Sequence, residues 1–158
     1  KGSVKGAELT ANVPLNKVSS ALDGFGLAGS STYIDAELED GPRIPVQSDR
    51  VLTLTAYYEK DGFEVRFAGT KRSDFVTYER SGSNKIGEAT RNGVTLLDAQ
   101  VSYDFSESSY TQLKGLRVSL QGTNLTDVDE ETVDSNGIVT TRRQFGPTYL
   151  LNFNYAFY

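Results

Sequence analysis

Cysteine, histidine, methionine and tryptophan are all absent from this chain of 158 residues. Without cysteine and histidine, the protein has no thiolate or imidazole group. The common Zn, Cu and haem ligand sets are therefore excluded, as is any Ser-His or Cys-His catalytic pair. We therefore expect a protein that is not an enzyme, and the sequence implies no metal site and no cofactor.

Excess positive charge and long apolar stretches are also missing. The 16 Lys and Arg residues are outnumbered by 21 Asp and Glu residues, and the resulting net charge of −5 argues against a nucleic-acid partner. A membrane-spanning helix needs roughly 18 or more consecutive apolar residues. The strongest apolar run, 51–58, is interrupted by Thr53 and Thr55, so no spanning helix is expected.

What the sequence does contain is apolar residues at every second position, the spacing of β-strands with one apolar face. With flanking residues, most of these segments reach roughly 8 to 12 residues, whereas strands of soluble sheets usually have about five or six. A tilted strand needs about 9 to 11 residues to cross a bilayer. The seven predicted strands are 7–13, 25–33, 52–58, 63–68, 97–105, 116–121 and 149–157.

The connections after residue 58 differ in length in a regular way: 59–62 is short, 73–93 is long, 106–115 is intermediate and 124–143 is long. Short turns at one end and long polar loops at the other are typical of an outer-membrane barrel. Aromatic residues near strand ends also favour a barrel, since they match interfacial girdles. These residues are Tyr57, Tyr58, Phe63, Tyr103, Phe105, Tyr155 and Phe157. A soluble β-sandwich or lipocalin-like barrel alternates in the same way and stays open as an alternative.

An odd strand count adds a constraint. Bacterial single-chain barrels have even strand numbers, and an open sheet in lipid would leave edge amides unpaired at several kcal/mol each. Seven strands therefore predict a piece of a larger barrel or one chain of a multichain barrel. Val118 and Leu120 alternate with Arg117, Ser119 and Gln121, so we expect the two apolar side chains to face lipid.

The last third of the chain resembles a known family. A Gly-Leu-Arg-Val-Ser-Leu strand leads into the box Asn-Leu-Thr-Asp at 124–127, and a final aromatic strand follows at 149–157. This tail is similar to that of TonB-dependent outer-membrane receptors. Upstream, 47–63 resembles the family's strand, periplasmic turn and return strand, and 97–103 the strand after an outer loop.

The resemblance implies an all-β fold, an antiparallel transmembrane β-barrel of about 22 strands closed by a plug domain. Residues 1–158 would supply about the last seven strands, with the plug and the earlier strands absent. The implied function is import of a scarce nutrient, such as a siderophore, a cobalamin-like compound or an oligosaccharide, across the outer membrane of a Gram-negative bacterium. A passive porin or structural barrel and a soluble β-sandwich binding module are the alternatives.

The implied partners are the TonB system, reached through the absent N-terminal region, the barrel-assembly machinery, lipid and lipopolysaccharide, and a small-molecule nutrient. Candidate substrate contacts on the lumen wall and outer loops are Arg66, Arg72, Tyr78, Arg80, Asp98, Gln100 and Arg117. The default role of polar residues on such a wall is contact with water.

Two further groups of residues are the final aromatic strand and an acidic run in the last long connection. The expected barrel-assembly signal is Tyr149, Leu151, Phe153, Tyr155, Phe157 and Tyr158, although family members usually end on the aromatic that aligns with Phe157. An acidic run could offer oxygens to Ca²⁺. Its spacing does not match an EF-hand, and a solvated acidic loop is the favoured interpretation. The run comprises Asp127, Asp129, Glu130, Glu131 and Asp134.

Overall fold

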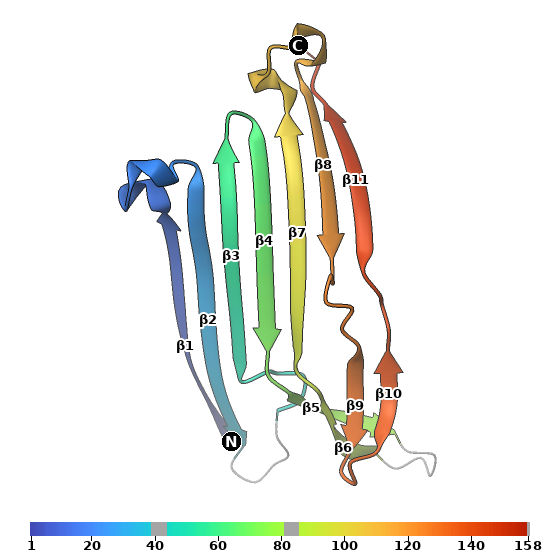
Figure 1. Ribbon diagram of the computed structural model, residues 1–158. Coiled ribbons are helices and arrows are strands. Elements are labelled where there is room, and N and C mark those ends of the chain that lie inside the picture. The colour runs from blue at the N-terminus through green and yellow to red at the C-terminus, as the bar shows by residue number, and fades with distance from the viewer. Residues whose placement is uncertain (39–43, 81–85, 158) are drawn as a thin grey trace.

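Two antiparallel sheets make up the protein. The computed structural model describes residues 1–38, 44–80 and 86–157, which contain eleven strands and four short 3₁₀ helices. The first sheet has seven long strands, in the order β1-β2-β3-β4-β7-β8-β11 (Figure 1). Its strands are β1 (Gly2–Pro14), β2 (Phe25–Leu38), β3 (Arg50–Lys60), β4 (Phe63–Arg72), β7 (Val94–Asp104), β8 (Leu116–Thr123) and β11 (Thr148–Tyr155).

These seven strands are the seven that the alternating pattern predicts, and several are longer than expected. The 3₁₀ helices, Leu15–Lys17, Ser20–Leu22, Phe105–Glu107 and Thr111–Leu113, lie in the connections between β1 and β2 and between β7 and β8. No helix among the described residues is long and apolar enough to span a membrane.

Each face of the seven-stranded sheet has a uniform character because neighbouring strands pair in matching register. The row Ala11, Gly29, Leu54, Gly69 and Leu97 crosses five strands through consecutive pairs on one face. Val118 and Leu120 lie on this apolar face, since they pair with Tyr103 and Val101 on β7. The opposite, polar face carries residues such as Thr55, Arg66, Gln100 and Ser119.

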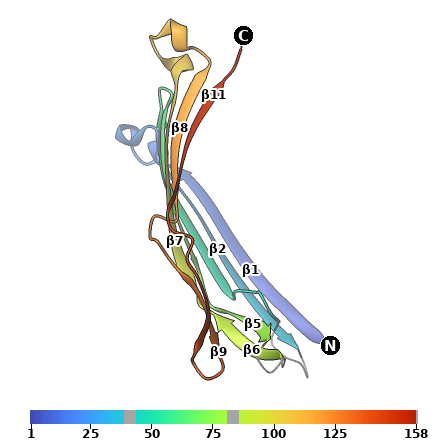
Figure 2. The same ribbon diagram turned by 90° about the vertical axis from the view of Figure 1, so that its right-hand side faces the viewer.

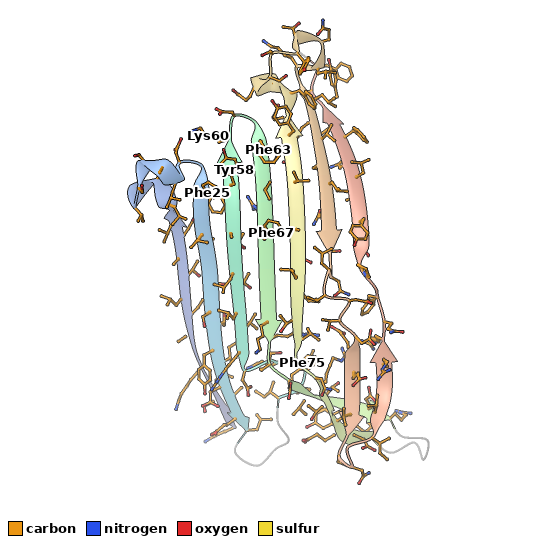
Figure 3. All side chains as sticks on the ribbon, in the orientation of Figure 1. Phe25, Tyr58, Lys60, Phe63, Phe67 and Phe75 are labelled. Atoms are coloured by element: carbon orange, nitrogen blue, oxygen red, sulfur yellow. The ribbon has the colours of Figure 1, made fainter. Side chains whose placement is uncertain are left out.

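Aromatic side chains gather at the short-turn end of the apolar face. The ring of Tyr58 lies 4.6 Å from Phe25 and 6.2 Å from Phe63, centroid to centroid. Phe63 is paired with Tyr103 on β7. Figure 3 shows Phe25, Tyr58 and Phe63 together at this end. The sheet therefore carries the aromatic row that the sequence predicts.

Tyr57 is the exception, and its assignment to the girdle was wrong. Its hydroxyl donates to Asn12 Oδ1 at 3.2 Å on the polar face, and its ring lies directly over Gly26. Because strand side chains alternate, Tyr57 and Tyr58 must point to opposite faces.

At the long-loop end, Tyr33 occupies the apolar face of β2. Eight residue steps separate it from Phe25. At about 3.3 Å per step, the two aromatic residues bracket roughly 26 Å of strand. That length is close to the apolar band of about 25 Å on outer-membrane barrels.

The two long connections, which the sequence presents as polar loops, form a second sheet. This sheet has the order β10-β9-β6-β5 and lies at the long-loop end of the first (Figure 2). Pairing of β6 with β9 joins the two connections. Its strands are β5 (Phe75–Arg80), β6 (Ile86–Arg91), β9 (Glu130–Asp134) and β10 (Val139–Arg143). We call it the loop sheet.

The loop sheet is curled, so that its two edge strands, β5 and β10, are in contact. Glu79 on β5 accepts hydrogen bonds from Thr140 at 2.7 Å and Thr141 at 3.4 Å, both on β10. β5 with β6 and β9 with β10 form local hairpins, whereas β6 pairs with β9 across more than 40 residues. Each strand is short, and the two hairpins join only through the long-range pair, so alternation along one segment carries little signal for this sheet. These segments were therefore expected to be loops.

The buried hydrophobic residues of the described chain are few: Phe75, Val76, Ala89 and Val94. They lie in the loop sheet or at its junction with β7. By contrast, Leu54 and Phe153 on the apolar face are 59% and 64% exposed. A soluble β-sandwich buries this face against a second layer. No described element covers it here, and this weighs against the sandwich.

The seven-stranded sheet is open. Its edge strands, β1 and β11, each pair with one neighbour within the described residues and lie on opposite sides of the sheet (Figure 1). Unpaired edge amides are expensive in lipid, so both edges require further strands before the sheet can sit in a membrane. The odd strand count predicts the same requirement.

Candidate functional site

The predicted substrate contacts fall into two groups. Four lie on the polar face of the long sheet, where β4, β7 and β8 bring them together: Arg66, Asp98, Gln100 and Arg117. The other three, Arg72, Tyr78 and Arg80, lie at the junction with the loop sheet or on β5.

Glu64 is the centre of the charged network on the polar face. Arg117 donates to its carboxylate, and an Arg66 nitrogen lies 3.2 Å from the other carboxylate oxygen. Ser102 completes the group, donating to Glu64 at 3.4 Å and accepting from Arg117 at 3.1 Å. The Glu64 side chain is only 13% exposed, whereas both arginines are about half exposed. The network therefore holds two guanidinium groups in place while leaving them open to solute.

Sequence reasoning found both arginines but missed Glu64. The sequence does contain a signal for Glu64. It alternates with the apolar residues Phe63 and Val65, so its side chain lies on the same face as that of Arg66. Gln100 lies in the next row, paired with Arg66 on one side and Gln121 on the other. Polar hydrogen-bonding groups thus continue from the network along the wall.

Asp98 has a structural partner. Its carboxylate accepts the backbone N–H of Asn124 at 2.9 Å, at the start of the Asn-Leu-Thr-Asp box. The Asn124 side chain accepts from Val128 N–H at 3.0 Å and donates to the Gly146 carbonyl at 3.2 Å. Asn124 and Asp127 both have positive φ, a conformation that Asn and Asp tolerate better than most residues. The box thus forms a tight turn that ends β8.

Arg72 joins the long sheet to the loop sheet. Its guanidinium pairs with Glu130 on β9 and lies 5.3 Å from the centre of the Phe75 ring. Arg91 lies 5.6 Å from the same ring, and its Nε donates to Thr132. Phe75 is therefore held near two cations, in a packed junction between the sheets.

The acidic run is distributed over several partners. Glu130 binds Arg72 and Glu131 binds Arg142, while Asp134 caps a turn. Among the described residues, no group of three or more acidic side chains is arranged to hold a metal ion. These carboxylates anchor the loop sheet through ion pairs and a turn.

Acidification is expected to loosen the β9–β10 turn. The Asp134 carboxylate accepts the N–H groups of Ile138 and Asn136, both at 2.9 Å, and these bonds hold its pKa below the ordinary 3.8, that from Ile138 contributing most. A lowered pKa gives stability that is present above pH 3.8 and lost as the pH falls through the folded-state value.

Amide exchange at Ile138, corrected for intrinsic rates, should therefore accelerate below about pH 3.8, the unfolded-state value. Asp134→Asn retains a side-chain acceptor but does not titrate, so it should remove most of this dependence. Identical pH profiles in the two proteins would contradict the assignment.

A cleft of about 880 Å³ opens beside the start of β3, between the outer part of β2 and β5. Its carboxylates include Asp35, Glu37, Asp49 and Asp74. Val46 N–H donates to the Val76 carbonyl at 2.8 Å beside the cleft and ties segment 44–50 to β5. The cleft gives the long-loop end of the sheet an acidic recess.

The expected assembly signal lies on the edge strand β11 and just beyond it. Tyr149, Leu151, Phe153 and Tyr155 share the apolar face, and the Tyr155 ring packs edge-on against Phe157 at 4.8 Å. Tyr158 is outside the described residues. Recognition of these residues by assembly machinery stays a prediction.

Comparisons with known proteins agree with this architecture. The family model described as "TonB dependent receptor-like, beta-barrel" matches residues 1–125, whereas no curated protein matches the chain. Among solved structures, the fold is similar to that of the ferric citrate transporter FecA in its unliganded form, with a TM-score of 0.74 at 22% identity. The match covers 97% of this chain and 24% of the FecA chain, so this sequence spans about a quarter of that protein's length. With an open antiparallel sheet of matching shape and a family model over most of its length, the chain belongs to the TonB-dependent receptor-like β-barrel family.

Proposed function

We propose that this chain forms the C-terminal part of the barrel of an outer-membrane receptor that imports a scarce small-molecule nutrient. The observation that carries the proposal is the two-faced sheet. One face is apolar and uncovered across seven strands, and the other holds an organised charged network. A lipid-facing outside and a water-filled inside account for both.

The family supports TonB as the source of energy, acting through a part of the receptor outside these residues. The structural neighbour is a transporter of ferric citrate, and this supports a small solute as cargo. A siderophore, a cobalamin-like compound and an oligosaccharide are the classes to test.

Within the barrel, Arg66 and Arg117 are the leading candidates for contact with the passing nutrient. Glu64 holds both, and both expose about half of their side chains on the polar face. Guanidinium groups bind carboxylate, phosphate and hydroxyl oxygens through several donors. Gln100 adds hydrogen-bonding capacity in the adjoining row, and Arg72, Tyr78 and Arg80 are the candidates at the outer end.

Uptake in the source bacterium tests the function. Deleting the gene for the full receptor should abolish uptake of one labelled nutrient from a panel of ferric siderophores, cobalamin and oligosaccharides. The intact gene should restore it only in cells that have TonB. TonB-independent uptake together with steady conductance in planar bilayers would identify a passive porin instead. A protein that stays in solution without detergent would identify a soluble module.

The two arginines can be tested in the complemented strain. Arg66→Gln combined with Arg117→Gln should lower uptake at limiting nutrient by about tenfold, since two charge-assisted contacts are lost. Arg143→Gln, on the edge strand β10 of the loop sheet, is the matched control and should leave uptake within about twofold. Unchanged uptake in the double variant, at equal receptor abundance, would remove these arginines from the nutrient path.

A further inference from the structure

Tyr57 is the only aromatic residue on the polar face of the seven long strands, within the part of the chain that the structure describes. The other aromatic side chains of these strands lie on the apolar face, where contact with lipid accounts for them. A ring on a polar wall gains nothing from lipid, so its position has another cause. The polar face lines a water-filled interior only if the apolar face lies against lipid, so this inference rests on the proposed function.

The Tyr57 ring lies face-on against the backbone of β2. A Cβ atom added to Gly26 would be 2.1 Å from Cζ, 2.2 Å from Oη and 2.6 Å from Cε2 of the ring. Gly26 therefore sits below the plane of the ring, because beside the edge of the ring an ε carbon would be the nearest atom. Only a glycine leaves room for this arrangement. One face of the ring is covered by β2, and the other points away from the sheet.

The hydroxyl of Tyr57 fixes the ring along the wall. It donates to Asn12 Oδ1 at 3.2 Å, so the side chain crosses β2 and reaches β1 (Figure 1). A ring that is held at its far end and backed by a strand is rigid, and a rigid aromatic face binds a ligand at a small entropic cost. Among the described residues, no other ring and no cation stacks on Tyr57. Its outer face is therefore open to a solute.

Planar polar groups continue from the ring along the same cross-strand row. Arg66 lies directly opposite Tyr57 on β4. Its guanidinium turns toward Glu64, at 3.2 Å, and leaves the ring uncovered. The amides of Gln100 and Gln121 follow in register on β7 and β8. Three strand separations extend this row over about 14 Å, and its amides offer both donors and acceptors, whereas the guanidinium offers donors only.

We propose that Tyr57 is the stacking platform of a sugar-binding subsite near the short-turn end of the polar wall, and that the nutrient is an oligosaccharide. A sugar ring has C–H groups on its faces, which pack on an aromatic ring, and hydroxyl groups around its edge, which need donors and acceptors. Asn12, Arg66 and Gln100 supply these groups on either side of the platform. Because the row contains more amides than charges, it suits a neutral oligosaccharide better than an anionic ferric complex.

Binding of oligosaccharides to the full receptor in detergent tests the subsite. Maltohexaose, cellohexaose and xylohexaose are the probes, and calorimetric titration of the wild type identifies the one that binds most tightly. Tyr57→Thr keeps a strand-forming residue but removes the platform, so it should weaken this binding by about tenfold or more. Tyr57→Phe keeps the ring and loses one hydrogen bond, so it should stay within about threefold of the wild type. Tyr33→Thr removes an aromatic residue from the apolar face, and as the matched control it should change binding by less than about twofold.

A second measurement separates binding from a structural role of the ring, since an aromatic side chain over a glycine can also stabilise strand pairing. The heat-dependent gel shift of each variant gives its stability, and the stoichiometry of the titration gives the affinity per folded receptor. Lower stability of Tyr57→Thr with unchanged affinity would show that the ring only covers Gly26 and would overturn the subsite. So would a failure of all three probes to bind, or Tyr57-dependent binding of a ferric catecholate in their place. TonB-dependent uptake of another nutrient would then leave the proposed function standing, whereas the absence of TonB-dependent uptake of any nutrient would remove that function as well.

Discussion

Replacing Leu54 with arginine is expected to destabilise the membrane-embedded barrel by about 2 to 4 kcal/mol, the cost of an arginine near the bilayer midplane. Leu54 lies in the central row of the apolar face, between Gly29 and Gly69, and is 59% exposed. The measurement is the reversible unfolding of the full receptor in phospholipid vesicles, followed by the heat-dependent gel shift typical of folded barrels.

Two further arginine variants serve as controls for this experiment. Thr55→Arg places the same side chain one residue further along β3, on the polar face, and should cost less than about 1 kcal/mol because lumen positions tolerate charge. Val118→Arg should cost about 0 to 1 kcal/mol, because Val118 pairs with Tyr103 in the aromatic row, near the interface. Equal costs for Leu54→Arg and Thr55→Arg would contradict the assignment of inside and outside.

Replacing Phe75 with alanine is expected to lower the local stability of the loop sheet by about 3 kcal/mol, the low end for truncating a buried phenylalanine. The side chain is 7% exposed and lies beside the guanidinium groups of Arg72 and Arg91. Its loss removes the largest buried apolar group at the junction of the two sheets. Amide exchange in β6 and β9 should accelerate strongly, and proteases added to intact cells should cut the outer connections faster.

The long sheet should survive this change, since its strands pair independently of the loop sheet (Figure 3). Ile138→Ala is the control in the same subdomain. That side chain is 61% exposed, and its truncation should cost less than about 0.5 kcal/mol. Phe75→Leu keeps much of the volume and should cost about 1 kcal/mol. Unchanged exchange in β6 and β9 of Phe75→Ala would show that the loop sheet does not depend on this junction.

Much of the fold could be predicted because strand alternation is local. Leu52, Leu54, Ala56 and Tyr58 occupy every second position of one segment. This spacing places their side chains on one face of a strand whatever lies around it. Strand length, the odd strand count and the aromatic ends then favour a membrane barrel, and the tail around Asn124 indicates the family. The polar wall residues Arg66, Gln100 and Arg117 follow from the same alternation.

The site required information that the alternation does not contain. Glu64 holds Arg117 across more than 50 residues, and Asp98 holds the Asn124 turn across 26, because pairing in register brings their strands together. The same holds for Tyr57 and Asn12, which meet only when β1, β2 and β3 pair.

The sequence by itself determined the two faces of the seven long strands, because the alternation of side chains along a strand does not depend on which strands lie beside it. Only the tertiary structure decided that the two long connections pair through β6 and β9, that Phe75 is buried at their junction, and which charges neutralise one another. Short strands have little stability alone, and the Arg72–Glu130 ion pair that ties β9 to the long sheet joins residues far apart in the chain. Their conformation is therefore a property of the assembled sheets, whereas the alternation of the long strands is already present in the chain.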